Sequence, residues 1–318
     1  MPHRRNENGS RSSVSVCLPA LNEETTIGGI CKAIRSELMP GLVDELIVID
    51  TGSADTTTAV AAAAGAAVYR VDDIGPRLRS GGKGEALWKS VAVARGDVIV
   101  WIDSDIQNFT PDFVTRLITP LLASSRLIMT KAYYRRPLQL DATSHDDEGG
   151  GRITEIALRP LMNLLYPKLA DIVQPLSGEY AIRREVAVDL PFFSGYGVDI
   201  ALLMDVVSRY GRAAVQQVDL GIRVHNNRSL HALGRTSFEV LAAFLTRMAD
   251  QDRVALQEPL GDALRQFDAG NNSFVSHPEI MELPSWRSFR TKIPGLDFIS
   301  NEEGDSKSFG RASSGTSG

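Results

Sequence analysis

Short runs rich in β-branched residues alternate with longer helical stretches from residue 13 onward, and this alternation restricts the fold more than any other feature. Five runs have the length and composition of buried strands, namely 13–18, 45–50, 66–69, 97–102 and 127–132. Helical stretches lie between them at 25–38, 56–64, 84–94 and 111–122. This order is typical of βαβ units, so the sequence predicts an α/β fold with a mainly parallel central sheet flanked by helices.

The chain changes character after residue 140, where a polar, glycine-containing loop at 141–151 leads into a second half. That half contains expected strands at 180–183 and 215–224 and an expected helix at 199–210. We therefore divide the chain into a flexible N-terminus (1–12), a first half (13–140), a second half (141–230), a C-terminal helical extension (231–300) and a disordered tail (301–318).

The helix expected at 235–251 has two notable features. Thr236 and Glu239 form a capping-box pattern at its start. An apolar stripe along one face is typical of core packing or of a subunit interface. It consists of Phe238, Leu241, Leu245 and Met248.

Charge and hydropathy exclude several classes of protein. Among 318 residues, 34 Lys and Arg face 39 Asp and Glu, for a net charge of −5, which argues against a protein that coats nucleic acid. No apolar run approaches the roughly 20 residues that span a bilayer, and no apolar segment follows the basic N-terminus, so we expect a cytoplasmic protein without a membrane span. The two cysteines, Cys17 and Cys31, match neither a redox pair nor a zinc site and are expected to be reduced.

Three polar loops directly follow expected strands, and a fourth precedes the helix expected at 84–94. Parallel strands bring such loops to one edge of a sheet. The loops are 19–23, 50–53, 81–84 and 103–105. Lys83 is followed by Gly84 where a phosphate-binding P-loop requires Ser or Thr, and no GxGxxG fingerprint follows a strand. The sequence therefore excludes a P-loop enzyme and disfavours a dehydrogenase.

The acid pair Asp103 and Asp105 follows the apolar run 97–102 directly. If the period of two persists, both carboxylates point to one side of the strand end. Two such groups favour a hard cation such as Mg²⁺ or Mn²⁺, which would bind a diphosphate. The alternative is that both acids are solvated turn residues.

Four further residues or segments are candidates for binding an anion, a nucleoside or a metal. Lys83 opens a helix and could reach a phosphate, or it could be a surface lysine; Glu23 could hold a nucleoside or only begin the first helix. The segment 149–154 joins glycines to Arg152 and Thr154, which suits an anionic group, unless it is a hinge beside a solvated arginine. His225 could ligate a metal among cationic and amide neighbours, or could be a structural histidine.

Taken together, the motifs resemble those of the glucosyl-3-phosphoglycerate synthases, retaining glycosyltransferases of the family numbered 81, which have the GT-A fold. The motifs are PALNEE, DxGSxD, GKGEAL, DSD, GGGRxTE, QPLSGEY, GYGV and RxHxNR, and they span about 14–245. The resemblance implies that 13–140 is a nucleotide-binding half and 141–230 an acceptor-binding half, and that the extension contributes to a homodimer.

The resemblance also implies roles for individual residues. The nucleotide-sugar site would contain Pro19, Leu21, Glu23, Thr51, Ser53, Lys83, Asp103, Ser104, Leu176 and Asp199. The acceptor site would contain Gly151, Arg152, Thr154, Arg223, Asn227 and Arg228. Asp105 and His225 would ligate Mg²⁺ or Mn²⁺, and the catalytic group would be Lys83, Asp105, Asp199 and His225.

The implied reaction transfers glucose from a nucleoside-diphosphate glucose to 3-phosphoglycerate with retention of configuration. Two departures from the family pattern stand out: Asp199 replaces a usual Glu, and Asn226 replaces a more usual basic residue. The shorter carboxylate leaves open a mannosyl-3-phosphoglycerate synthase that uses GDP-mannose. A sugar-phosphate nucleotidyltransferase and a silent nucleotide-sugar binding module are further alternatives.

Overall fold

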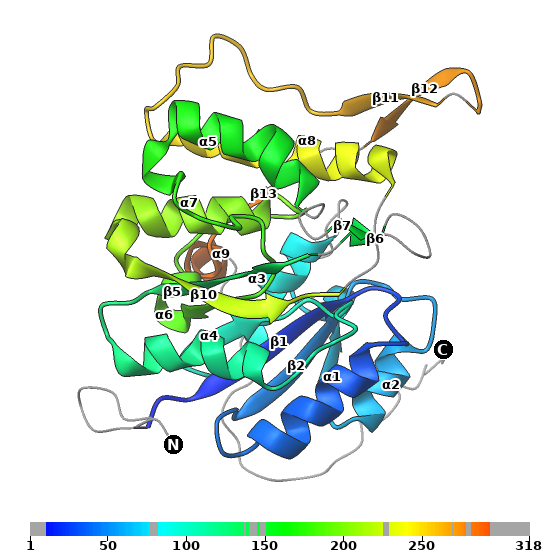
Figure 1. Ribbon diagram of the computed structural model, residues 1–318, viewed down its shortest axis with the longest axis vertical. Coiled ribbons are helices and arrows are strands. Elements are labelled where there is room, and N and C mark those ends of the chain that lie inside the picture. Colours follow the sequence, from blue (N-terminus) through cyan, green and yellow to red (C-terminus); the bar gives the residue numbers. More distant parts are fainter. Residues whose placement is uncertain are drawn as a thin grey trace, which may run out of the picture.

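The core of the molecule is a seven-stranded sheet in the order β10-β5-β8-β4-β1-β2-β3 (Figure 1). The computed structural model describes residues 11–76, 82–136, 138–139, 145–146, 151–224, 229–268, 270–277 and 281–292. The sheet strands are β1 (Val14–Ala20), β2 (Glu45–Asp50), β3 (Ala67–Arg70), β4 (Val98–Trp101), β5 (Met129–Arg135), β8 (Tyr180–Arg183) and β10 (Val215–Ile222). All neighbours run parallel except β8, which is antiparallel to both β4 and β5.

Helices cover both faces of the sheet, as the sequence predicts. The α-helices are α1 (Ile27–Ala33), α2 (Thr57–Ala63), α3 (Lys83–Val93), α4 (Asp112–Ala123), α5 (Arg159–Leu165), α6 (Arg184–Ala187), α7 (Val198–Tyr210), α8 (Leu230–Asp250) and α9 (Trp286–Lys292). Two π-helical turns, η1 (Ile34–Leu38) and η3 (Thr154–Leu158), extend α1 and precede α5. Short 3₁₀ turns are η2 (Val71–Asp73), η4 (Pro167–Leu169) and η5 (Arg212–Ala214).

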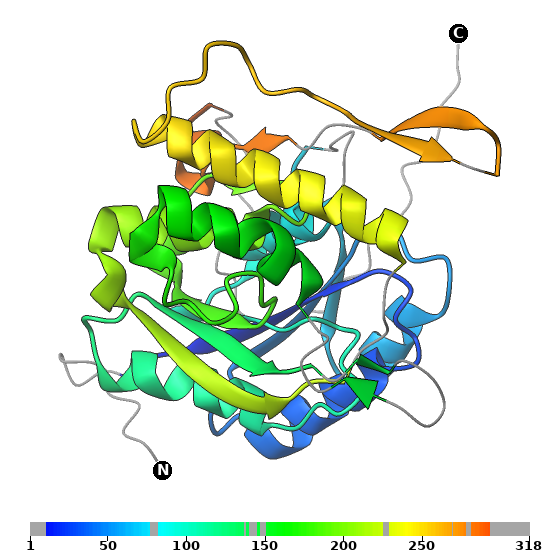
Figure 2. The same cartoon turned by 45° about the horizontal axis from the view of Figure 1, so that its top comes forward.

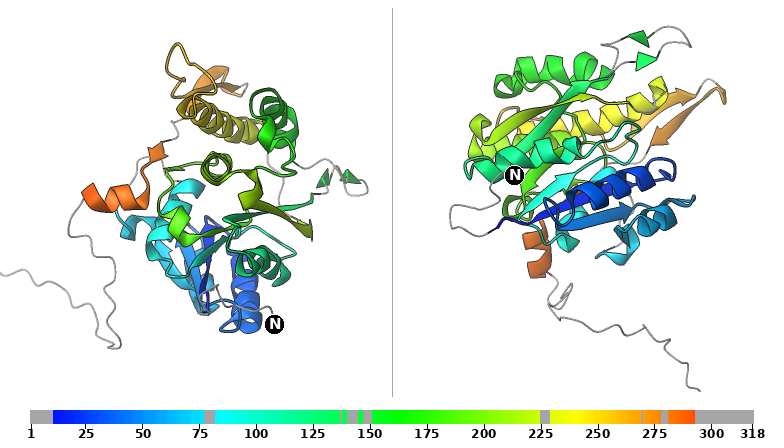
Figure 3. Two further views of the ribbon diagram at one scale, coloured as in Figure 1. Left: turned by 90° about the vertical axis from the view of Figure 1, so that its left-hand side faces the viewer. Right: turned by 60° about the horizontal axis from the view of Figure 1, so that its bottom comes forward.

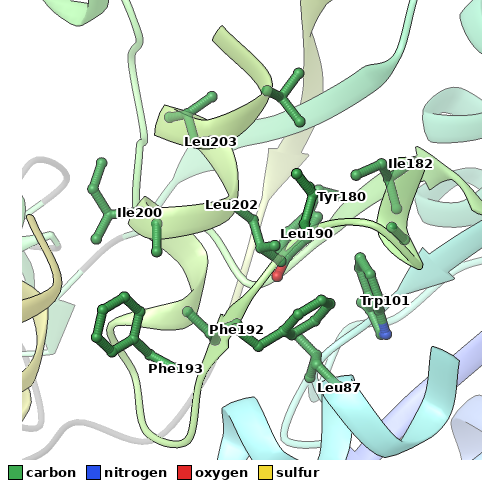
Figure 4. Close-up of a cluster of buried hydrophobic side chains, with 14 of the residues drawn as sticks. Leu87, Trp101, Tyr180, Ile182, Leu190, Phe192, Phe193, Ile200, Leu202 and Leu203 are labelled. Carbon is green, nitrogen blue, oxygen red and sulfur yellow. The ribbon is translucent and has the colours of Figure 1, made fainter. Parts of the chain in front are cut away.

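Side chains alternate along the strands and divide the core into two layers. Trp101 and Cys17 belong to the layer that also contains α3 and α7, whereas Val16 and Val100 belong to the layer with α1 and α4. Figure 3 shows the sheet between these helices. In the first layer, the Trp101 ring lies 5.2 Å from that of Tyr180 and 6.2 Å from that of Phe192 (Figure 4). These contacts fix β8 and the segment before α7 on the sheet.

The two predicted halves share this one sheet, because β8 from the second half lies between β4 and β5 from the first. Each predicted strand is present, with ends shifted by a few residues at most. Both cysteines are buried and unpaired, as expected. None of the helices in the described ranges is long and apolar enough to cross a membrane.

The C-terminal extension contains strands as well as the predicted helices. β11 (Leu264–Asp268) and β12 (Ser273–His277) form a hairpin, and β13 (Glu282–Leu283) pairs with β9 (Phe192–Phe193). A small pair, β6 (Leu138–Gln139) and β7 (His145–Asp146), lies between the halves in sequence. The Trp286 ring of α9 stacks 4.3 Å from that of Trp88 on α3, so the end of the described chain packs on the first half.

The predicted capping box at Thr236 and Glu239 is wrong. The helix α8 begins at Leu230, and the Ser229 hydroxyl accepts a hydrogen bond of 3.3 Å from the Ala232 amide. Thr236 lies inside the helix and donates to the Ala232 carbonyl instead. The helix starts before the capping-box pattern because helical propensity and packing outweigh that local signal, and Ser229 caps the actual start of the helix.

Candidate functional site

A cleft of about 590 Å³ opens at the carboxyl ends of β1, β2 and β4. Its lining comes from three sources: the strand ends, the start of α3 with the turn before α7, and one face of α8. The residues are Pro19, Ala20, Leu21, Glu23, Thr51, Gly82, Lys83, Asp103, Ser104, Asp105, Gly195, Tyr196, Ala232, Arg235, Thr236 and Glu239. The predicted convergence of polar loops on one edge of the sheet is therefore confirmed.

Asp103 and Asp105 point to the same side of the end of β4. One nitrogen of the Arg223 guanidinium, Nη2, lies 3.0 Å from Asp103 Oδ2 and 2.7 Å from Asp105 Oδ1. Burial opposes ionisation of Asp103, but Lys83 and Arg223 outweigh it and hold the pKa of that carboxyl well below its usual range. Asp103 is thus ionised, and the carboxylates of Asp103 and Asp105 lie together at one point of the cleft.

Lys83 joins three segments that are far apart in sequence. Its Nζ lies 2.9 Å from Asp103 Oδ1 and 3.0 Å from Asp199 Oδ2, at the start of α7. Burial alone would lower the pKa of Lys83, but the two carboxylates raise it well above its ordinary value. Gly178 makes room for the pair, because a Cβ there would lie 2.2 Å from Asp103 Oδ2 and 2.4 Å from Lys83 Nζ.

The position of Lys83 is set by close backbone packing at the start of α3. A Cβ on Gly84 would lie 1.7 Å from the Phe193 carbonyl oxygen, so only glycine fits there. The Glu85 amide donates a hydrogen bond of 3.0 Å to the Ser194 carbonyl. The start of α3 is therefore fixed against the segment that leads into α7.

Behind the acid pair lies a buried group that the sequence interpretation did not include among the site residues. Glu179 Oε1 is 3.0 Å from Arg223 Nε, and the Tyr134 hydroxyl donates to Glu179 Oε2 at 2.6 Å. Glu179 belongs to the QPLSGEY motif, which was its only sequence signal. Arg223, which was predicted among the acceptor residues, forms ion pairs with three carboxylates, and its role toward the acceptor stays a prediction.

Four residues that the resemblance assigns to the nucleotide-sugar site line one side of the cleft, namely Pro19, Leu21, Glu23 and Thr51. Burial first, and then the charge of Asp105, raises the pKa of Glu23 to about 7.

Two predicted residues support the loops of this side. The Ser104 hydroxyl donates to the Pro19 carbonyl at 2.5 Å while Ser104 also lines the cleft. Ser53 is not part of the described lining, and its hydroxyl accepts from the Asn22 amide at 2.9 Å. Its hydrogen bond shapes the loop after β1.

The predicted acceptor residues are only partly within the described chain. Gly151 has a positive φ of 73° and its carbonyl accepts from the Glu155 amide at 3.0 Å, which opens the helical segment that contains Arg152 and Thr154. None of these three lines the cleft described above, and Leu176 packs against the core. His225, Asn227 and Arg228 lie outside the described residues, so their roles stay predictions.

The acid pair fits a divalent cation by its chemistry. Carboxylate oxygens are the ligands that Mg²⁺ and Mn²⁺ prefer, and the Asp105 side chain is 30% exposed to the cleft. Within the ranges that the structure describes, no cluster of three or more metal-binding side chains occurs. The predicted third group, His225, lies outside those ranges.

Comparisons with known proteins agree on one family. The model of glycosyl transferase family 2 matches residues 15–187. A glucosyl-3-phosphoglycerate synthase of Petrotoga mobilis is 45% identical over 268 residues, covering 83% of this chain and 82% of that protein. That of Mycobacterium tuberculosis is 49% identical over 243 residues, covering 76% of this chain and 75% of that protein.

A solved structure of the same type has the same fold. It is the crystal structure of glucosyl-3-phosphoglycerate synthase from Mycobacterium tuberculosis in complex with Mn²⁺, UDP-glucose and phosphoglyceric acid. It superposes with a TM-score of 0.77 at 42% identity and covers 88% of this chain and 92% of that chain. The GT-A fold and a glycosyltransferase architecture are thereby shown for this chain.

Proposed function

The chain matches the model of glycosyl transferase family 2 and belongs to the glucosyl-3-phosphoglycerate synthases. On that premise we propose that it transfers glucose from UDP-glucose to 3-phosphoglycerate with retention of configuration. The observation that carries the proposal is the position of Lys83, which lines the cleft and whose ammonium joins Asp103 of the acid pair to Asp199. A solved relative binds Mn²⁺, UDP-glucose and phosphoglyceric acid, which supports this substrate pair.

The donor lies with its nucleoside toward Pro19, Leu21, Glu23 and Thr51 in this proposal. Asp105 and His225 hold a divalent ion, which supplies positive charge to the departing diphosphate. Lys83 fixes the carboxylate of Asp199, so that its oxygens can accept hydrogen bonds from the sugar.

Arg152 and Thr154 hold the acceptor in this proposal, and Gly151, Asn227 and Arg228 are the other residues that the resemblance assigns to it. The guanidinium of Arg152 offers two parallel donors to a phosphate or carboxylate. No described side chain stands out as a covalent nucleophile, so the acceptor hydroxyl attacks from the side on which the diphosphate leaves. Positioning and electrostatics then carry the rate acceleration.

The donor preference is tested with a panel of UDP-glucose, GDP-glucose, UDP-mannose and GDP-mannose, each with 3-phosphoglycerate and Mg²⁺. Release of the nucleoside diphosphate should be fastest with UDP-glucose. Faster turnover of GDP-mannose would replace the proposal by a mannosyl transfer, and no transfer from any donor would refute it.

We further propose that the protein acts as a homodimer in which the hairpin β11–β12 contacts a second copy. The hairpin projects beside α8 (Figure 2) and exposes Phe267, Phe274 and Val275. The hairpin contacts α8 through β11, where Gln266 donates to the His231 carbonyl at 3.3 Å, and a second copy would cover its exposed apolar side chains. Sedimentation equilibrium should give twice the monomer mass for the protein and a monomer for Phe274→Glu, whereas a monomeric unmodified protein would refute the dimer.

A further inference from the structure

We propose that Arg235, on α8, binds the diphosphate of the nucleotide-sugar donor. The proposal rests on the proposed function and adds a binding residue that neither the motifs nor the comparisons assign. It is carried by the face that α8 presents to the cleft and by the distribution of charge on the cleft lining.

One face of α8 forms part of the cleft. Ala232, Arg235, Thr236 and Glu239 are spaced by three, four and seven residues from the first, so they share a side of the helix. All four line the cleft together with Pro19, Leu21 and Glu23 on the proposed nucleoside side. Arg235 is therefore exposed to solvent within the cleft that is proposed to hold the donor.

The helix is held firmly in this position. The Tyr196 amide donates to the Glu239 carboxylate at 2.7 Å, one turn of helix beyond Arg235. Close packing adds to this, because a Cβ on Gly197 would lie 2.5 Å from the Ala243 Cβ and 2.7 Å from the Glu239 carbonyl oxygen. The start of α7, which contains Asp199, and the arginine on α8 are thus parts of one rigid unit.

The cleft lining contains two cations within the described residues, and only Lys83 of the two is already engaged with carboxylates. Lys83 is bound to Asp103 and Asp199. The guanidinium of Arg223 is bound to both acids of the pair and to Glu179 behind them. Arg235 forms no ion pair with any residue of the described ranges. Four acids line the cleft against the two cations Lys83 and Arg235. A bound anion therefore finds one available guanidinium on the described lining.

The diphosphate is the part of the substrates that suits this guanidinium. A nucleoside diphosphate has more negative charge than one divalent ion neutralises, and a guanidinium binds phosphate oxygens through paired donors. The predicted acceptor residues Gly151, Arg152 and Thr154 do not line this cleft, whereas the nucleoside-side residues do. The anion that Arg235 meets is accordingly the donor's diphosphate rather than 3-phosphoglycerate.

The test measures binding of UDP and of uridine, each with saturating Mn²⁺, to the unmodified protein and to Arg235→Ala. Calorimetry should show UDP affinity reduced by about tenfold or more, as for the loss of a hydrogen-bonded charge. Uridine affinity, measured by ligand-observed NMR, should change by less than about twofold, because the nucleoside contacts are intact. Arg235→Lys should restore part of the UDP affinity.

Arg116→Ala is the matched control, since Arg116 is an exposed helical arginine on α4 that does not line the cleft. Its UDP affinity should equal that of the unmodified protein. The inference fails if Arg235→Ala binds UDP normally, if uridine affinity falls in parallel, or if only the KM for 3-phosphoglycerate rises. These outcomes are separate from failure of the proposed function, in which the unmodified protein binds UDP but transfers no glucose.

Discussion

The ammonium of Lys83 lies 3.0 Å from the carboxylate of Asp199, although 116 residues separate them in the chain. The contact joins the first residue of α3 to the first turn of α7. Because the same ammonium also contacts Asp103 at the end of β4, one buried cation sets the relative positions of three elements. Because Asp199 does not belong to the described cleft lining, a change of this residue is expected to alter catalysis more than nucleotide binding.

Asp199→Asn tests that expectation with a side chain of the same size and no charge. The kcat/KM for UDP-glucose should fall by about 10- to 100-fold, as for the loss of a charged hydrogen bond, while UDP affinity stays within about twofold. Steady-state kinetics and calorimetry with UDP provide the two measurements, with Asp219→Asn on β10 as the control. An equal loss of UDP affinity would place Asp199 in nucleotide binding instead.

Arg152→Ala should raise the KM for 3-phosphoglycerate by more than about tenfold and leave that for UDP-glucose nearly unchanged, because a bidentate charged contact is lost only on the acceptor side. Arg152→Lys keeps the positive charge but loses the paired guanidinium donors, so its KM for 3-phosphoglycerate should be intermediate. Initial rates with each substrate varied in turn provide the test. If both KM values rose together, the acceptor would bind elsewhere.

The lowered pKa of the buried Lys131 predicts how the free energy of unfolding depends on pH. Its Nζ donates to the Ser177 carbonyl at 2.8 Å and lies 4.1 Å from the centre of the Tyr180 ring, and burial lowers its pKa to about 8. Between pH 8 and the ordinary value of 10.5, the unfolded chain binds this proton and the folded protein does not, so the contribution of Lys131 to stability rises with pH.

Urea unfolding of the unmodified protein and of Lys131→Met at pH 7, 8.5 and 10 isolates this contribution. The stability difference between them should shift in favour of the unmodified protein by up to about 1.4 kcal/mol per pH unit above pH 8. A difference that does not vary with pH would show that Lys131 keeps its ordinary pKa.

Gly84→Ala and Gly29→Ala form a matched pair of substitutions in helices. A Cβ at Gly84 would lie 1.7 Å from the Phe193 carbonyl oxygen, so Gly84→Ala should destabilise the fold by about 3 kcal/mol or displace Lys83. A Cβ at Gly29 meets nothing within 4 Å, so Gly29→Ala should stabilise α1 by about 0.5–1 kcal/mol. Denaturant unfolding compares them, and similar stabilities would contradict the close packing at Gly84.

Parallel-sheet geometry explains why much of the site could be predicted. Strands that run in one direction bring their carboxyl ends to one edge, and this placed Glu23, Thr51 and Asp105 in the same cleft. The pairing of Glu179 with Arg223 could not be predicted in this way, since it depends on where β8 inserts into the sheet.

The contribution of α8 could not be predicted either, and local signals were misleading there. Thr236 and Glu239 have the spacing of a helix start, yet they lie inside α8 and face the cleft. Their role depends on the packing of α8 against Gly197, a contact between distant segments that no local pattern records.

The central claim is a glucosyl transfer that depends on a divalent ion held by the acid pair, and product analysis tests it most directly. UDP-glucose and 3-phosphoglycerate are incubated with Mg²⁺ and the protein, and the products are followed by proton and phosphorus NMR. UDP and an α-linked glucosyl-3-phosphoglycerate should form together, and both should be lost in EDTA and with Asp105→Ala. Undiminished UDP formation by Asp105→Ala in EDTA would contradict the account.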